Sequence, residues 1–338
     1  MNFYTLTSKS SYSSKKWIFI TLMVSMLISA IIFITNYIVD PYNMTKYNLL
    51  NIKHKLARDD RRTKLNFFKT QDKFDNILIG SSRVYTINPR VASEILGGTT
   101  YNFGVGTASV EDHLGILKYL QKEDKLPKNL IIGIDFYTFN PAIPADRHFL
   151  INKELNFLTF SGSSQNELEL FFSIDALRAS IKTLKHHIRK TDKKPSFDSL
   201  GWSGAYINYK IINKDLELNA AKYELAQIGQ KFYTDYSYSK LDKKRLEYYA
   251  EIKKICKENS IHLYIFTTPL HPLVIKELKG HQETNKALKE FIAFLEDFQN
   301  FYNFYEDEIF KTNYDHFAGA THTKQNAGDI ILKTLLKK

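Results

Sequence analysis

A serine near the start of the chain's body and a histidine near its end are the residues best suited to chemistry. The apolar run from Asn76 to Gly80 reads NILIG, as expected for a buried strand, and Ser81 and Ser82 follow it directly. A serine hydroxyl becomes a useful nucleophile only when a neighbouring base takes its proton. We therefore expect Ser82 to be the nucleophile, with Ser81 as the alternative.

The candidate base is His322, which lies shortly before a helical pattern over residues 325–336. Asp315 stands seven residues before it. Asp315 can orient the imidazole if the intervening loop bulges, because a catalytic triad requires only proximity in space. The alternative is a Ser–His dyad in which a backbone carbonyl orients the ring. His316 is a rival base, with Asn313 three residues before it. These residues indicate Ser/His hydrolase or acyl-transfer chemistry.

Strand and helix patterns alternate through the body of the chain, which predicts an α/β fold. Such alternation is typical of a mostly parallel sheet covered by helices on both faces. Strands are expected at residues 77–79, 100–103, 130–136, 261–267 and 301–305, and helices at 91–96, 110–120, 241–258, 283–298 and 325–336. Ligands of these sheets bind beyond the carboxyl ends of the strands. Ser82, Gly104, Asp135 and Thr268 should therefore gather at one edge.

An uncharged apolar segment at residues 17–38 is long enough to cross a bilayer as a helix. It is too long for a cleaved signal peptide, and no small-x-small cleavage site follows it. Basic residues flank it on both sides, so charge alone does not orient it. The usual signal-anchor layout places residues 1–16 in the cytoplasm. We expect a single-pass protein of the inner or plasma membrane with an extracytoplasmic domain, periplasmic or at the cell surface.

Two segments fall outside the regular alternation. Residues 39–74 are polar and basic, and we interpret them as a partly helical juxtamembrane connector before the main domain at 75–338. Within that domain the alternation is lost at about 141–238. This region holds an amphipathic segment at 168–184, a basic run at 185–194 and a tyrosine-rich strand pattern at 205–212. We interpret it as an insertion or lid that shapes the substrate groove.

The composition narrows the range of partners. The formal net charge is +11, but the basic residues are scattered and no nucleic-acid recognition motif accompanies them. An anionic membrane surface or envelope polymer suits this charge, as does a merely lysine-rich composition. Cys256 is the single cysteine, so no intrachain disulfide forms, and we expect it in the core. His186 and His187 have no carboxylate partner pattern, so no metal site is expected.

The chain resembles the SGNH/GDSL hydrolase superfamily over roughly residues 76–135 and 261–338. Within it the chain is most similar to membrane-anchored envelope members, such as the D-alanyl-transfer proteins of teichoic acids and the alginate-type acetyltransferases. The family's Gly-Asp-Ser block corresponds to Gly80-Ser81-Ser82, which makes Ser82 the nucleophile. Its second block, which supplies a glycine N–H to the oxyanion, corresponds to Gly104 in Tyr101-Asn102-Phe103-Gly104.

Two positions depart from the family pattern. The third block, Gly-x-Asn-Asp, normally donates an asparagine amide to the oxyanion, but here Asp135 stands in its place. An ionised carboxylate cannot donate a hydrogen bond. Asp135 is then protonated, binds a substrate hydroxyl or Arg83, or marks lost activity. Asn102, Thr138 and Asn140 are the nearby substitutes. The second departure lies in the last block, Asp-x-x-His, which ends at His322: the position three residues before it holds Gly319 instead of aspartate.

The resemblance implies a flavodoxin-like three-layer sandwich of SGNH type after one transmembrane helix. It implies a serine esterase or O-acyltransferase acting on cell-envelope glycans through an acyl-enzyme, without a cofactor. The implied partners are an envelope glycan or acyl-carrying substrate and membrane-bound acyl-transfer machinery; nucleic acid is not expected. The alternative is a catalytically inactive binding or assembly factor with the same fold.

Overall fold

A computed structural model of the chain describes residues 8–41, 49–52, 60–150, 152, 154–158, 171–189, 197–203 and 214–337. Its contacts divide the chain into two compact units. One comprises residues 1–62 and 164–194, and the other comprises residues 63–163 and 195–338. The second unit contains the sheet and all of the candidate site residues named above.

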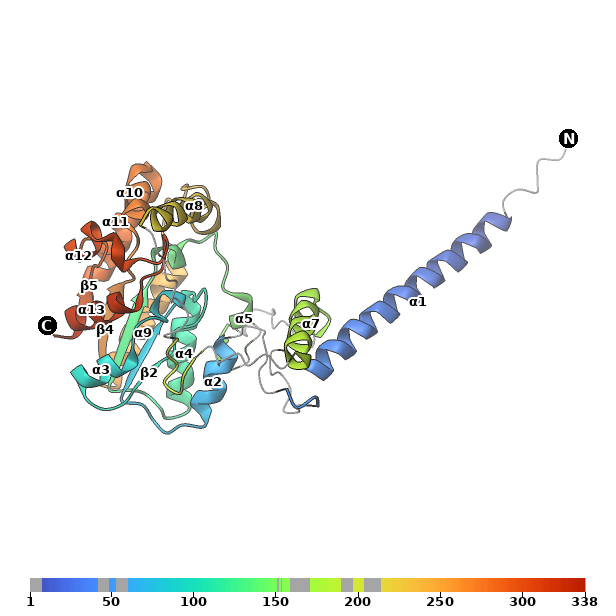
Figure 1. Ribbon diagram of the computed structural model, residues 1–338, viewed down its shortest axis with the longest axis horizontal. Coiled ribbons are helices and arrows are strands. Elements are labelled where there is room, and N and C mark those ends of the chain that lie inside the picture. The colour runs from blue at the N-terminus through green and yellow to red at the C-terminus, as the bar shows by residue number, and fades with distance from the viewer. Residues whose placement is uncertain are drawn as a thin grey trace. The chain divides into compact units, whose positions relative to one another are not determined.

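In the described part of the chain, five strands form one parallel sheet in the order β2-β1-β3-β4-β5 (Figure 1). The strands are β1 (Asn76–Gly80), β2 (Thr100–Asn102), β3 (Asn129–Ile134), β4 (His262–Thr267) and β5 (Phe301–Tyr302). The chain passes from β1 to β2 on one side and then crosses to β3 on the other. The carboxyl ends of β1 and β3 therefore flank a topological switch point, where ligands of such sheets bind.

The strands are apolar on both faces, which explains why helices cover the sheet on both sides. Ile77, Ile79 and Ile132 belong to one buried core, whereas Leu78 and Ile131 belong to another. This alternation follows from the two-residue period of a strand. The first core is completed by α2 (Asp60–Lys69), α4 (Val110–Lys122), α8 (Lys214–Phe232), α9 (Lys243–Glu258), α10 (Pro272–Gly280) and α11 (Gln282–Glu296). The second is completed by α3 (Pro89–Leu96), α12 (Glu308–Thr312) and α13 (Gln325–Leu336).

The strands and helices expected outside the 141–238 region are all present, with ends shifted by a few residues. The α/β class and the parallel sheet are thus confirmed. Helices α8 and α10 were not expected. Pro272 occupies the first turn of α10, where its missing N–H costs nothing. The strand expected at 205–212 lies outside the described residues.

The other unit contains α1 (Ser8–Val39) and α7 (Ile174–Ile188). Residues Ser14–Val39 of α1 are long and apolar enough to cross a membrane, and the most apolar window of this stretch is not buried within the protein. The end of α1 packs against α7. Asn36 donates to the carbonyl oxygens of Phe171 and Ser173 and accepts from the Ser180 hydroxyl. These bonds satisfy a polar side chain that would otherwise be costly in an apolar segment.

The buried His113 in α4 makes the stability of the body depend on pH. Its Nδ1 lies 2.7 Å from the Tyr249 hydroxyl, and burial lowers its pKa from 6.5 to about 4. Between pH 6.5 and about 4, His113 is therefore protonated in the unfolded chain but neutral in the folded chain. Stability rises with pH across that window, so this contribution is complete above 6.5 and is lost on acidification.

We expect His113→Gln to weaken that dependence, by up to roughly 3 kcal/mol between pH 7 and pH 4. Urea unfolding of the full chain in detergent, measured at both pH values, gives the difference. The control is His262→Gln, at an exposed position on β4. An unchanged pH dependence in His113→Gln would contradict the assignment.

Candidate active site

The turn that carries Ser82 is built by the end of β1. Gly80 has φ +154°, and a Cβ there would lie 2.7 Å from the carbonyl oxygen of Gly133, so only glycine fits. The short 3₁₀ helix η1 (Ser82–Val84) follows at once, and the Ser81 side chain caps it by accepting a hydrogen bond from the N–H of Arg83 at 3.2 Å. Ser81 therefore has a structural task, while the hydroxyl of Ser82 remains directed at the site.

His322 is presented by a tight loop near the C-terminus. An isolated antiparallel bridge joins Phe317 to Thr323, and the N–H of Ala318 donates to the carbonyl oxygen of His322 at 2.9 Å. The N–H of His271, after β4, donates to the carbonyl oxygen of Ala320 at 3.1 Å. The loop is thereby attached to the carboxyl edge of the sheet, although it is distant from β1 in sequence.

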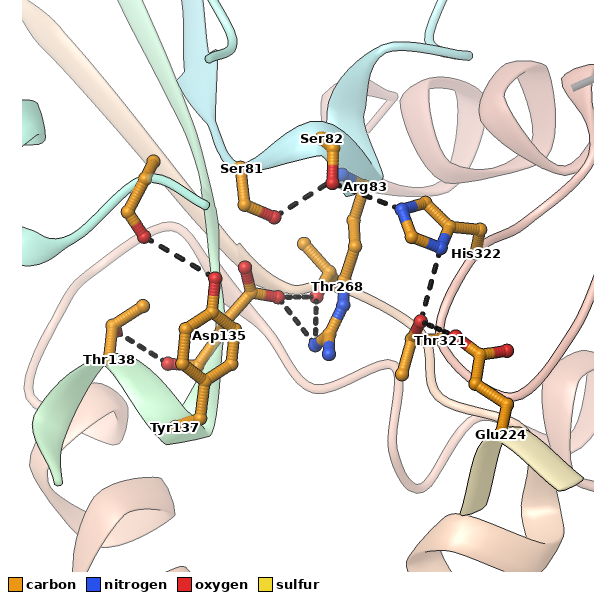
Figure 2. A network of polar contacts seen from close by, with 11 residues as sticks. Ser81, Ser82, Arg83, Asp135, Tyr137, Thr138, Glu224, Thr268, Thr321 and His322 are labelled. Carbon is orange, nitrogen blue, oxygen red and sulfur yellow. Dashed lines mark hydrogen bonds and ion pairs between the residues drawn. The ribbon is translucent and has the colours of Figure 1, made fainter. Parts of the chain in front are cut away.

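The two predicted reactive residues meet at this edge. The Ser82 hydroxyl lies 3.0 Å from Nε2 of His322 (Figure 2). Both side chains are partly buried, so they are sheltered from bulk water yet still reachable. This distance allows His322 to accept the serine proton as Ser82 attacks an electrophile. The arrangement has the geometry of a nucleophile and its general base.

The second ring nitrogen of His322 contacts a threonine. Nδ1 lies 3.1 Å from the hydroxyl oxygen of Thr321, and that hydroxyl donates to Oε1 of Glu224 at 2.7 Å. Figure 2 shows this row of groups running from Ser82 through the imidazole to the carboxylate. Glu224 comes from α8, within the region expected to be an insertion. Asp315, the expected orienting residue, is exposed in the 3₁₀ turn η4 (Tyr314–His316).

The rival base His316 has a different environment. It is buried, and its Nε2 lies 3.3 Å from the side-chain nitrogen of Asn313. Burial lowers the pKa of His316, and the nearby Asp315 carboxylate opposes this shift only in part. The Ser82 hydroxyl, by contrast, lies within hydrogen-bond distance of His322. The geometry therefore favours His322 as the base.

Asp135 lies at the end of β3 and forms a buried ion pair. Its carboxylate is 2.8 Å from Nη1 of Arg83, and the hydroxyl of Thr268 donates to the same oxygen. Burial by itself would lower the pKa of Arg83, but the Asp135 carboxylate and the nearby Tyr233, Tyr137 and Tyr305 together outweigh burial and raise it. The guanidinium also lies over the ring of Tyr137, 5.3 Å from its centroid. Of the roles open to Asp135 in the sequence, the contact with Arg83 is the one observed.

Asn102 and Gly104 are hydrogen-bonded to each other. The N–H of Gly104 donates to Oδ1 of Asn102 at 3.0 Å, and the Asn102 amide donates to the carbonyl oxygens of Val84 and Ile87 at 2.8 and 3.1 Å. Asn102 therefore ties the end of β2 to the nucleophile turn. In this arrangement the Gly104 N–H can donate to an oxyanion only if it first breaks its hydrogen bond to Oδ1 of Asn102.

The other polar residues near Asp135 also bond to main-chain groups. The Thr138 hydroxyl donates to the carbonyl oxygen of Asp135 at 2.6 Å, and the Asn140 amide donates to that of Phe232 at 3.0 Å. Both side chains are buried. These bonds give Thr138 and Asn140 a part in holding the backbone after β3.

Comparison with known proteins leaves the geometry as the main guide to function. No protein-family model matches this chain. No curated protein matches it either.

Thr321 and Glu224 are the site residues that the sequence did not indicate. Thr321 directly precedes His322, so its adjacency was a usable signal. Glu224 offered none, because α8 shows only weak amphipathic patterning and lies about a hundred residues from His322. Only the folded chain brings that carboxylate to the histidine loop.

We expect Asp135→Asn to destabilise the body strongly, because it leaves the buried Arg83 cation without its counter-charge. Removing one partner of a buried ion pair typically costs about 3–5 kcal/mol. Urea unfolding of the full chain in detergent measures the change. The control is Glu258→Gln, which removes an exposed partner of Lys254 and should cost under about 1 kcal/mol. Equal effects of the two substitutions would contradict the role assigned to the buried pair.

Proposed function

We propose that this chain is a membrane-anchored serine esterase or O-acyltransferase that acts on cell-envelope glycans through an acyl-enzyme. The observation that carries the proposal is the 3.0 Å contact between the Ser82 hydroxyl and Nε2 of His322. These residues are 240 positions apart in the chain, so a chance polar turn does not account for their meeting.

The proposed reaction uses side chains alone. His322 takes the Ser82 proton as Oγ attacks the acyl carbonyl carbon, and then gives that proton to the departing alkoxide. The acyl group is left as an ester on Ser82. An acceptor hydroxyl, on a glycan or on water, then gives its proton to His322 and attacks this ester. The acyl–Oγ bond breaks, and His322 returns the proton to Oγ of Ser82. Transfer and hydrolysis differ only in which acceptor reaches the site.

The negative charge on the carbonyl oxygen requires hydrogen-bond donors. The Gly104 N–H is the proposed donor, and it would leave Oδ1 of Asn102 when the charge develops. Catalytic hydrogen bonds often reach their final geometry only with substrate bound. Asp135 has no part in this step, because its carboxylate is paired with Arg83.

The fold supports a finer assignment to the flavodoxin-like, SGNH-type three-layer sandwich. The strand order β2-β1-β3-β4-β5 is that of doubly wound sheets with a switch point between β1 and β3. Ser82 follows β1 and Asp135 follows β3, so the proposed site lies at that switch point. Helices contributing to two separate cores agree with three layers.

Helix α1 supports the proposed location. It supplies an apolar length sufficient for one membrane span. In the proposed topology the catalytic domain is extracytoplasmic and stays close to the bilayer, where envelope polymers and membrane-bound acyl-transfer machinery are within reach. The acyl-carrying substrate would come from that machinery.

A second candidate function is a catalytically inactive binding or assembly factor with the same fold. The observation that favours it is that the candidate oxyanion donors are already engaged: the Asn102 amide donates to main-chain carbonyls, and the Asp135 carboxylate is paired with Arg83. Chemical reactivity of Ser82 separates the two functions.

We expect a fluorophosphonate probe to label the full chain in detergent on Ser82. Ser82→Ala should abolish labelling, and His322→Gln should slow it by about 10³-fold or more, because the serine loses its base. The matched control is Ser81→Ala, which should still be labelled although it loses a helix cap worth about 1 kcal/mol. In cells, Ser82→Ala should lower the acyl-ester content of the envelope. Absence of labelling in the unmodified chain would favour the binding function.

A further inference from the structure

The hydrogen bonds around Thr321 determine which nitrogen of His322 carries a proton. A threonine hydroxyl has one proton to donate. That proton goes to Oε1 of Glu224 at 2.7 Å, so the hydroxyl oxygen can only accept from the ring. Nδ1 of His322, 3.1 Å away, must then be the protonated nitrogen. Nε2 then carries the lone pair that accepts from the Ser82 hydroxyl.

Glu224 is itself held firmly in place. Its other oxygen, Oε2, accepts from the N–H of Ala320 at 2.6 Å, so the carboxylate bridges two consecutive residues of the histidine loop. Gly319 leaves space for it: a Cβ at this position would lie 2.5 Å from Oε2. Gly319 also has φ +139°, which disfavours any other residue. The site thus replaces a carboxylate on the histidine loop by one from a separate helix.

We propose that Glu224 is the positioning residue of this site and acts on His322 through the Thr321 hydroxyl. The proposal rests on the proposed function and deepens it: the α8 part of the 141–238 region belongs to the catalytic machinery. The carboxylate keeps the Thr321 proton turned away from the ring, which selects the tautomer able to accept from Ser82. It also stabilises the imidazolium that forms during the reaction, without taking the proton.

Substitutions at Glu224 and Thr321 test the relay in the full chain in detergent. Glu224→Gln and Thr321→Val should slow fluorophosphonate labelling by about 10–100-fold, less than loss of the base itself. Thr321→Ser keeps the hydroxyl and should restore most of the rate. The matched control, Glu247→Gln, removes an exposed carboxylate on α9 and should leave the rate unchanged.

The tautomer provides a readout that a merely structural role would not move. In the chain labelled with ¹⁵N-histidine, the His322 signals are identified by their loss in His322→Gln. At about pH 8 they should report a protonated Nδ1 in the unmodified chain and a mixture of tautomers in Thr321→Val. An unchanged tautomer, or an unchanged labelling rate in Glu224→Gln, would overturn the relay. Failure of the unmodified chain to label would instead overturn the proposed function, while the tautomer would still test the relay.

A separate observation concerns α7. Its face toward α1 carries the small buried residues Ala176, Ser180 and Thr183. Ile174, Ile181 and Ile188 recur every seven residues on another face, where they are 60, 55 and 75% exposed. Arg178 and Lys185 lie between these isoleucines on the helical surface. An apolar row with adjacent cations is the pattern of a helix that lies in an anionic membrane surface.

Contacts with α1 place α7 beside the end of the proposed membrane span. A bilayer core is crossed by about 20 residues, so a span that starts at Trp17 emerges near Asn36. Asn36 bonds to Ser173, the N-cap of α7, and to Ser180 in its middle. The ring of Phe172 lies 4.9 Å from that of Phe33, one turn deeper in the span. When α1 crosses a membrane, α7 must therefore lie at its surface.

We infer that α7 docks on the bilayer itself, with Ile174, Ile181 and Ile188 in the acyl-chain boundary and Arg178 and Lys185 at anionic headgroups. The test uses the full chain in vesicles containing anionic lipid, with Cys256→Ser as background. An environment-sensitive fluorophore on Ile181→Cys or Ile188→Cys should be quenched by spin-labelled lipid. The same fluorophore on Lys182→Cys, an exposed position on a different face, should be quenched by an aqueous quencher. Equal aqueous quenching at all three positions would overturn the inference.

Discussion

The buried ion pair between Arg83 and Asp135 is the interaction on which the arrangement of the site depends. It joins the turn after β1 to the end of β3, and Thr268 adds the end of β4 to the same cluster. Two charges removed from water are costly unless each is fully paired. The pair therefore has few alternative arrangements, and the carboxyl ends of three neighbouring strands are held in one geometry. Ser82, one residue before Arg83, is positioned as a consequence.

The polar network extends outward from this pair in two directions. Asn102 connects β2 to the main chain of the nucleophile turn, so the turn is supported from both sides of β1. On the other side, the histidine loop is attached to the sheet through His271 and to α8 through Glu224. Each of these bonds joins segments far apart in sequence. The site is therefore rigid only when the whole body is folded, and local stability and site geometry are coupled.

The sequence was most informative where a local pattern has one physical meaning. Continuous apolar runs ending in glycine or a polar residue predicted the strands, and parallel topology then predicted which residues share an edge. That topology places Ser82, Asp135 and Thr268 at one edge of the sheet, and bonds of the histidine loop to His271 and Glu224 bring His322 to the same edge. Asp315 was predicted to orient the ring on the condition that the loop bulges, and in the fold it lies exposed in η4. The contact of His322 with Thr321, and of Thr321 with Glu224, depends on how α8 packs, and its sequence carries no trace of that packing.

The two departures from the expected motif have a common electrostatic explanation. An uncompensated carboxylate at position 135 would oppose an oxyanion, but the guanidinium of Arg83 balances it at 2.8 Å. A glycine at position 319 removes a carboxylate from the histidine loop, but Glu224 brings one to the same loop from another helix. Each position is thus accompanied by a compensating group: a cation beside Asp135 and a carboxylate beside Gly319. Asp135 and Gly319 are therefore compatible with an active site. The geometry of that site then depends on the positions of Arg83 and of Glu224 on α8.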